Sequence, residues 1–327
     1  MEQSQLTAQE MALRRIQQRR KQQALRRKRQ KRRRLFFLIL LFIVLGLAAI
    51  FLLFRPKSSD PAPLETFGPV FQLPHGPHFV PQETSYDDVD LTPREEDPPL
   101  MLELKALATE NPHIKKAVAR YDEYPENVLS AILFNPEMTD FVLDYPDKKD
   151  KRQRINLRKE ASASKVPLLL QWDERWGYET YGSGIIGLTG CGPTCLSMVA
   201  LYLTGNAEFS PDVIAKWSEE HGYYSNGSGT AWTLMSEGAA HWGLKSTELS
   251  LVQKYLVDEL DAGHPIICSM GPGDFTSSGH YIVLTAYDAE KGFSVNDPNS
   301  PERSAEYWSF QTLEHQISNL WAFSKAS

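Results

Sequence analysis

The sequence predicts an α+β domain over residues 165–327, preceded by a transmembrane helix over residues 35–54 and a small helical region over residues 100–160. Helix signals dominate the first half of the C-terminal domain and strand signals dominate the second half, an order typical of α+β domains. Of all residues, 42% are apolar and 11% are aromatic. This composition can bury a sizeable core and excludes a wholly disordered chain.

Charge is divided sharply along the sequence. The chain of 327 residues has 35 Lys and Arg against 41 Asp and Glu, a net charge of −6. Residues 1–34 hold 13 basic and 2 acidic residues, a balance of +11, whereas residues 58–327 hold 20 basic and 39 acidic residues, a balance of −19. This division excludes a plain cytosolic globule. The three cysteines are too few for a disulfide-based scaffold.

Residues 35–54 form an uncharged apolar run that is long enough to cross a membrane. A helix of these 20 residues spans about 30 Å, the thickness of the hydrocarbon core. A cleaved signal peptide is the alternative, but its apolar part is shorter, about 7–15 residues, and it ends in small residues. Here the run ends in Leu52, Leu53 and Phe54. We therefore expect an uncleaved anchor.

The basic residues before this run predict its orientation. Because positively charged flanks stay in the cytoplasm, we expect residues 1–34 to form a cytoplasmic tail and residues 58–327 to lie outside the cell membrane. The basic tail is expected to bind anionic lipid headgroups. Basic clusters of this kind also occur in nucleic-acid patches and nuclear signals. Their position beside the span favours lipid, so no nucleic-acid partner is expected.

Two regions separate the predicted span from the C-terminal domain. Residues 55–99 contain ten prolines and are expected to form an extended linker. Residues 100–160 are expected to form short helices, because Asn111-Pro112 and Asn135-Pro136 each combine an N-cap residue with proline at the first helical position. These residues carry no evident chemistry. A helical prop packed on the next domain is favoured over a substrate-docking platform.

The C-terminal domain, residues 165–327, is predicted element by element. Glycine, proline and capping signals predict helices over 192–202, from 210, over 230–243 and over 250–263, the last with a capping box formed by Ser250 and Gln253. Apolar and β-branched runs predict strands over 265–270, 280–287, 292–296, 305–309 and 320–323. The second and third of these strands are expected to form a hairpin.

One of the three cysteines lies where a helix begins. Glycine and proline in Gly190-Cys191-Gly192-Pro193 predict a turn into a helix, so Cys191 is expected at the helix N-terminus, where the dipole favours a thiolate. Cys195 and Cys268 lie in apolar surroundings and are expected in the core. A lone cysteine is most often a small buried hydrophobe, so Cys191 needs partners before it can be called a nucleophile.

Two such partners are found in the predicted hairpin. His280 begins a strand directly after a loop rich in Gly and Ser, where a general base could be held rigidly. Asp297 ends the neighbouring strand and could orient the imidazole. Strand alternation points Asn296 to the opposite face, so only one of the two can serve, and Asp297 is favoured. The alternative for Asp297 is a turn residue before Pro298.

Four ordered segments resemble those of a known family: 166–173, 190–194, 279–283 and 296–298. They resemble the cysteine-peptidase family 39-like domains, relatives of bacteriocin-processing peptidases in the papain-like superfamily. The resemblance implies a papain-like fold, with N-terminal helices packed on an antiparallel sheet. It implies Cys191 as nucleophile, His280 as base and Asp297 as orienter. It also implies Gln171 as an oxyanion-hole donor beside the Cys191 N–H.

Further residues have a structural alternative. From the residues alone, Gln171 could also be a surface amide on an edge strand. Trp232 and Gly279 are candidates for substrate binding, although a buried core position is the favoured alternative for Trp232. The Gly-rich segment 270–278 could form a lid over His280.

The predicted function is an extracytoplasmic cysteine peptidase that hydrolyses peptide or isopeptide bonds of a substrate outside the membrane. Two alternatives are a catalytically silent module that binds peptide or cell wall, and a cell-wall amidase or acyltransferase of the same superfamily. Cysteine and histidine spacing fits no zinc site, and no Gly-rich phosphate-binding loop is present. Neither a metal nor another cofactor is therefore expected.

Overall fold

The computed structural model describes residues 85–225 and 229–326. The predicted basic tail, the predicted transmembrane helix and most of the predicted linker lie outside these residues. Within the described ranges, no helix has the length and apolar character needed to cross a membrane.

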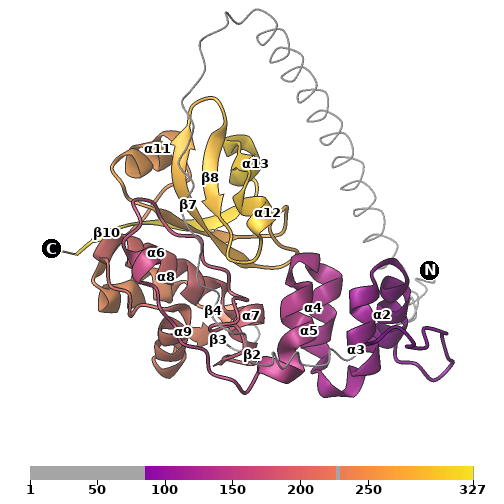
Figure 1. Cartoon of the computed structure of the whole chain (residues 1–327). Helices are drawn as coiled ribbons and strands as arrows, with labels where there is room; N and C mark the ends of the chain where they lie inside the picture. The colour runs from indigo at the N-terminus through magenta and orange to yellow at the C-terminus, as the bar shows by residue number, and fades with distance from the viewer. Residues whose placement is uncertain (1–84, 226–228, 327) are drawn as a thin grey trace, which may run out of the picture. The chain divides into compact units, whose positions relative to one another are not determined.

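A six-stranded antiparallel sheet is the centre of the C-terminal domain (Figure 1). Its strand order is β5-β10-β6-β7-β8-β9. The strands are β5 (Leu244–Glu248), β6 (Ile266–Met270), β7 (His280–Asp288), β8 (Gly292–Asn296), β9 (Tyr307–Trp308) and β10 (Ile317–Lys325). In the register of the central strands, His280 pairs with Met270, and Val283 pairs with Asn296.

Both faces of this sheet are buried, and successive side chains along a strand point to opposite faces. On β6 and β7, Ile267 and Val283 face the core that contains helix α8 (Cys191–Thr204), whereas Cys268 and Ile282 face a second core. The second core contains α11 (Gln253–Asp261) and Leu313 of α13 (Phe310–Glu314). Because helices cover both faces, the central strands read as continuous apolar runs.

Helix α8 is the most deeply buried helix of the domain. Its residues 192–201 are all buried, and it ends at Gly205, whose φ of 69° is the left-handed conformation that glycine adopts easily. It packs against α9 (Pro211–Glu220) and β7. The burial of α8 fixes the position of its first residue, Cys191, relative to the sheet.

Smaller elements surround this framework. Before α8 lie α6 (Arg158–Ala161), β1 (Thr180–Tyr181), β2 (Gly184–Ile185) and α7 (Ile186–Thr189), and after α9 lie β3 (Tyr224–Ser225), β4 (Gly229–Thr230), α10 (Thr233–Ser236) and the 3₁₀-helix η4 (Gly238–Trp242). Helix α12 (Pro301–Ser304) connects β8 to β9.

The helical region forms short helices as predicted. They are α2 (Pro99–Glu110), η1 (Pro112–Ile114), α3 (Lys115–Ala119), η2 (Tyr121–Glu123), α4 (Glu126–Phe134), η3 (Pro136–Met138) and α5 (Thr139–Lys148). The predicted caps at Asn111 and Asn135 are confirmed: each side chain accepts a hydrogen bond from the N–H two residues on. Both caps begin 3₁₀-helices rather than α-helices.

The core of the helical region continues into the C-terminal domain. Tyr178 and Ile185 belong to the same buried cluster as the helices. The rings of Phe141 and Tyr178 stack with centroids 4.3 Å apart, and the Tyr178 hydroxyl donates to the Phe141 carbonyl at 2.8 Å. The helices therefore pack on the next domain, as the favoured interpretation requires.

Three predicted elements differ from the structure. The helix predicted over 230–243 is instead β4, α10 and η4, and β5, which follows them, was not predicted. Ser250 makes no capping box, since α11 begins at Gln253 without a side-chain cap. The strand predicted over 305–309 is reduced to Tyr307–Trp308, because Ser300 caps helix α12 just before it.

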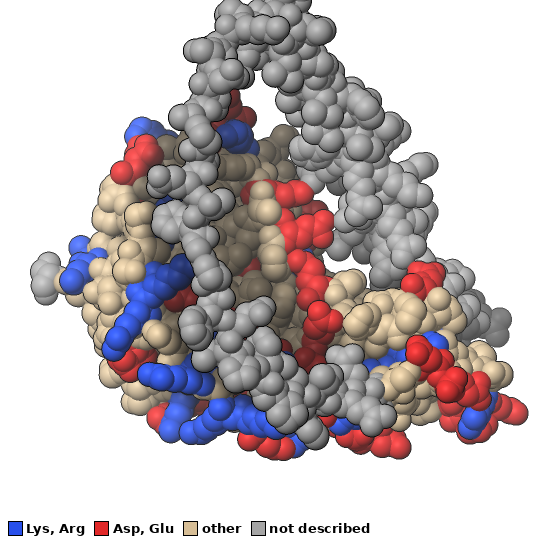
Figure 2. Space-filling view, viewed as in Figure 1, with Lys and Arg blue, Asp and Glu red and all other residues tan. Residues whose placement is uncertain are grey.

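Charged side chains are unevenly distributed on the viewed face (Figure 2). Lys and Arg gather along its lower edge, and Asp and Glu form a column near the centre. The segment 148–165 holds eight basic and two acidic residues, in contrast to residues 166–327, in which acidic residues outnumber basic ones. Its exposed basic residues are Lys149, Lys151, Arg152, Arg154, Arg158, Lys159 and Lys165.

We expect Phe141→Ala to lower the free energy of unfolding by about 3–5 kcal/mol, because the substitution leaves a cavity where two parts of the chain share one core. Urea denaturation of the full chain measures this change. Tyr255→Ala is the matched control, because Tyr255 is 49% exposed and its removal should cost less than about 1 kcal/mol. Equal costs for the two variants would contradict a shared core.

Candidate active site

Cys191 is the first residue of α8, as the sequence predicts. The glycines on each side allow close packing, since a Cβ at Gly190 would lie 2.6 Å from Ile186 Cγ2, and one at Gly192 would lie 2.7 Å from Thr230. The Cys191 side chain is partly exposed. Its backbone N–H belongs to the first turn, where N–H groups have no partner within the helix.

The other two cysteines lie in the core, as predicted. Cys195 and Cys268 are both 0% exposed, and burial raises the pKa of each thiol. A buried thiol with a raised pKa is a poor nucleophile. Cys191 is therefore the cysteine whose position suits chemistry.

His280 begins β7 and lies between two predicted partners. Its Nε2 is 2.7 Å from Asp297 Oδ1, and its side chain is 7% exposed. Cys191 neighbours His280 and is among the groups that raise its pKa. Because Asp297 occupies Nε2, Nδ1 is the nitrogen left for the thiol. The structure thus brings Cys191, His280 and Asp297 together from α8, β7 and the end of β8.

The electrostatics of the pair favour its charged form. Burial lowers the pKa of His280, but the charge and hydrogen bond of Asp297, together with the neighbouring Cys191, outweigh burial and raise the pKa from 6.5 to about 10. For Asp297, burial raises the pKa, but His280 and Arg303 lower it below the ordinary value of 3.8. Both shifts therefore stabilise the charged form of each group, the imidazolium of His280 and the carboxylate of Asp297.

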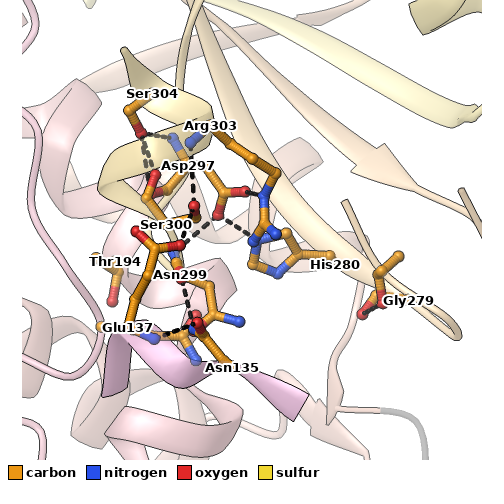
Figure 3. Close-up of polar contacts among 12 residues, drawn as sticks. Asn135, Glu137, Thr194, Gly279, His280, Asp297, Asn299, Ser300, Arg303 and Ser304 are labelled. Carbon is orange, nitrogen blue, oxygen red and sulfur yellow. Dashed lines mark hydrogen bonds and ion pairs between the residues drawn. The ribbon is translucent and has the colours of Figure 1, made fainter. Parts of the chain in front are cut away.

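Arg303 is a partner of Asp297 that sequence reasoning missed (Figure 3). Its Nε lies 2.5 Å from Asp297 Oδ2, whereas Oδ1 accepts from the N–H of Asn299 at 2.8 Å and contacts His280. Arg303 lies on α12, and the Ser300-Pro301 pair that begins this helix is an N-cap signal that could have revealed it. The fully buried carboxylate thus has a partner on each oxygen.

Asn296, the alternative orienter, points elsewhere. Its amide nitrogen donates to the carbonyls of Val166 and Pro167, at 3.1 Å each. These bonds hold the start of segment 166–170, which is not a β-strand. The segment leads to Gln171, whose N–H donates to the Pro298 carbonyl at 2.7 Å.

Gln171 is 3% exposed, so the alternative of a surface amide is wrong. Its Nε2 donates to the Gly187 carbonyl at 2.9 Å, and its Oε1 is buried without a hydrogen-bond partner in the described part of the chain. An amide nitrogen has two hydrogens, so one remains to donate.

Trp232 and Gly279 both lie at the surface. Trp232 is 48% exposed, which makes the core alternative wrong, and its indole N–H donates to Ser269 Oγ at 3.0 Å. It follows Thr230, whose side chain adjoins Gly192. Gly279 faces open space next to His280. Both are placed where a substrate could reach them, and their role in binding remains a prediction.

The Gly-rich segment 270–278 is tied down at its centre. Gln316 Oε1 accepts from the Asp274 N–H at 2.6 Å, and its Nε2 donates to Asp274 Oδ2 at 3.0 Å. The ring of Phe275 is buried against Trp308. These contacts oppose wide motion of the segment as a lid.

Residues 85–225 and 229–326 contain no group of three or more His, Cys, Asp or Glu side chains arranged to hold a metal ion.

Comparison with known proteins places the chain in a family. A family model described as "Peptidase_C39 like family" matches residues 163–326, half of the chain. The chain belongs to the Peptidase_C39 like family. Membership indicates a peptidase of the cysteine type, and the observed helices and antiparallel sheet are consistent with its α+β fold.

This Peptidase_C39 like chain is similar to a solved structure. The structure is the peptidase domain of Streptococcus ComA, described as a bi-functional ABC transporter involved in a quorum-sensing pathway. The two chains share 21% identity over 50% of this chain and 99% of that chain, with a TM-score of 0.35. The search of curated proteins gave no match.

We expect Asp297→Asn to lower the pKa of His280 by about 1–3 pH units, because the substitution removes the negative charge that raises it and leaves Arg303 unpaired. Histidine ¹⁵N NMR of the full chain measures this pKa, with His280→Gln identifying the signal. Asp288→Asn, at the other end of β7, is the control and should leave the pKa unchanged. An unchanged pKa in Asp297→Asn would contradict the described electrostatics.

Proposed function

We propose that this protein is a membrane-anchored, extracytoplasmic cysteine peptidase that hydrolyses peptide or isopeptide bonds. The observation that carries the proposal is the His280 imidazole, which is hydrogen-bonded to the buried Asp297 carboxylate and neighbours the Cys191 thiol. A partly exposed thiol at a helix N-terminus, beside a histidine with a raised pKa, is an arrangement that activates a cysteine.

In the first half of the proposed reaction, the thiol proton moves to His280, giving a thiolate and an imidazolium. The thiolate attacks the carbonyl carbon of the scissile bond, and the carbonyl electron pair moves to oxygen. As the C–N bond breaks, the imidazolium gives its proton to the leaving amine. The products are a free amine and an acyl group bonded to the sulfur of Cys191.

In the second half, the now neutral His280 takes a proton from water. The resulting hydroxide adds to the thioester carbonyl, and the C–S bond breaks as the carboxylic acid leaves. The thiolate and the imidazolium are then restored. Asp297 remains ionised throughout, since its role is to orient the imidazole and stabilise its positive charge.

We assign Cys191 N–H and Gln171 Nε2 as the donors to the oxyanion that forms in both halves. The first-turn N–H of α8 lacks a partner within its helix, and the positive end of the helix dipole favours negative charge there. The bond from Gln171 to the Gly187 carbonyl holds the amide in place. Such preorganised donors typically contribute about 10²–10³ to the rate.

The location of the site is inferred from charge and hydropathy. The uncharged run 35–54 after a basic tail supports an anchor with residues 58–327 outside the cell membrane. The substrate is then a peptide or protein on that side. In this proposal Trp232 and Gly279 contact the substrate, and the basic tail contacts anionic lipid headgroups inside the cell.

A thiol-directed peptidyl electrophile should label the wild-type protein and not Cys191→Ala, because the reactive thiolate is at residue 191. Mass spectrometry of the labelled full chain measures the adduct. Cys195→Ala is the matched control, because it removes a buried cysteine from the next turn of the same helix and should keep its label. Labelling that survives Cys191→Ala would overturn the assignment.

Products distinguish hydrolysis from the two alternative functions. A peptidase releases the free acid whether or not an amine is added, whereas an acyltransferase or transpeptidase-like enzyme gives the amide when an amine is present. Peptide binding without turnover at high protein concentration would indicate a silent binding module. Proteomic comparison of membrane-surface peptides from cells with wild-type and Cys191→Ala protein would identify the substrate.

A membrane-impermeant maleimide applied to intact spheroplasts should label Cys191, because the domain is proposed to lie outside the membrane. Gel shift of the full chain measures the label, and Cys191→Ala is the control that defines the background. Labelling only after the membrane is permeabilised would place the domain in the cytoplasm and contradict the proposed topology.

A further inference from the structure

We propose that Asn135 and Glu137 of the helical region are positioning residues of the peptidase site, which hold Asp297 through two chains of hydrogen bonds. This inference rests on the proposed function. Asn135 ends α4 and Glu137 lies in η3, more than 140 residues before Asp297 in the sequence. Figure 3 shows both side chains directed toward the loop that carries Asp297.

The first chain runs from Asn135 through Asn299. The Asn135 amide nitrogen donates to the Asn299 carbonyl at 2.8 Å and to Asn299 Oδ1 at 3.0 Å. The N–H of Asn299 donates to Asp297 Oδ1 at 2.8 Å. This is the oxygen that contacts His280. Asn135 therefore fixes the backbone that holds the orienting oxygen.

The second chain runs from Glu137 through Ser300 and Arg303. Ser300 Oγ donates to Glu137 Oε1 at 2.5 Å, and Glu137 Oε2 accepts from the Glu302 N–H at 3.0 Å. Ser300 Oγ also accepts from the Arg303 N–H at 3.0 Å, which makes Ser300 the cap of α12. Arg303 then contacts Asp297 Oδ2.

The two chains meet on the two oxygens of one carboxylate. Asp297 is 0% exposed and Ser300 is 1% exposed, so water offers them no substitute partners. Buried hydrogen bonds of this kind are costly to leave unmade, and a network loses more than one bond when a member is removed. The charged groups that face Asp297 are His280 from β7 and Arg303 from α12; Cys191 from α8 faces His280.

A second Asn-Pro pair in the same region shows that capping a helix and bonding to the loop after β8 are separate roles of Asn135. Asn111 has nearly the same backbone angles, φ −132° and ψ 99° against −136° and 90°, and it caps η1 as Asn135 caps η3. Of these two asparagines, Asn135 is the one that also donates to the loop after β8 in the described part of the chain. Capping therefore does not account for the contact with Asn299.

The variants remove the long-range bonds and spare the local ones. Asn135→Asp keeps the oxygen that caps η3 but loses the donor to Asn299, and Asn111→Asp is its matched control. Glu137→Ala removes the acceptor of Ser300, and Asp140→Ala, an exposed acidic residue three positions on, is its control. Glu137→Gln keeps an acceptor oxygen and should retain most of the wild-type rate.

The measurement is the rate at which p-nitrophenyl acetate acylates Cys191 in the full chain as a function of pH, with Cys191→Ala as background. We expect Asn135→Asp and Glu137→Ala to lower the optimal rate by about 10- to 100-fold, because a misplaced base loses its alignment. The alkaline limb of the pH–rate profile, where the rate falls as His280 loses its proton, should move to lower pH in both variants. The same shift is expected for Asp297→Asn, which lowers the pKa of His280. Asn111→Asp and Asp140→Ala should change neither property.

The outcomes separate this inference from the proposed function. If wild-type Cys191 is not acylated, the proposed function fails. If wild-type Cys191 is acylated and both variants react at the wild-type rate, the positioning role is wrong. It is also wrong if both variants react more slowly but their alkaline limb stays at the wild-type pH. Should either variant fail to fold by circular dichroism, Ser300→Ala breaks the second chain by removing one oxygen atom and must shift the alkaline limb if the inference is correct.

Discussion

The buried carboxylate of Asp297 is the constraint on which the site depends. An unpaired charge with no solvent contact would cost several kcal/mol, so a buried carboxylate persists only where charged or hydrogen-bonding partners surround it. His280 and Arg303 supply opposite charge, and Asn299 supplies an N–H. The same partners that make burial possible also hold the imidazole in the orientation that a base needs.

Much of the surrounding fold serves to bring these partners to one place. The antiparallel pairing of β7 with β8 places the start of one strand near the end of the other, and the buried helix α8 brings Cys191 to the same point. The loop after β8 is held by Gln171 on one side and by the helical region on the other. The helical region thus adds hydrogen bonds to the loop as well as hydrophobic packing.

Local rules predicted the central strands closely. Glycine, proline and apolar runs mark β6, β7 and β8, and their predicted ends lie within one residue of the observed ones. The rules failed over 230–243, where one helix was expected and β4, α10 and η4 were found, and they missed β5 directly after it. Elements of four or five residues are too short to be stable alone, so their contacts with the rest of the domain decide whether they form.

The sequence by itself determined where the chemistry-bearing residues lie on their own elements. Cys191 begins a helix, His280 begins a strand and Asp297 follows one, and each placement depends on neighbours a few residues away. Only the tertiary structure decided that Arg303, Asn135 and Glu137 belong to the same network, and that the Gln171 amide is buried. Those contacts join residues brought together by folding, and no short pattern records which polar side chain will meet a buried carboxylate or the loop that carries it.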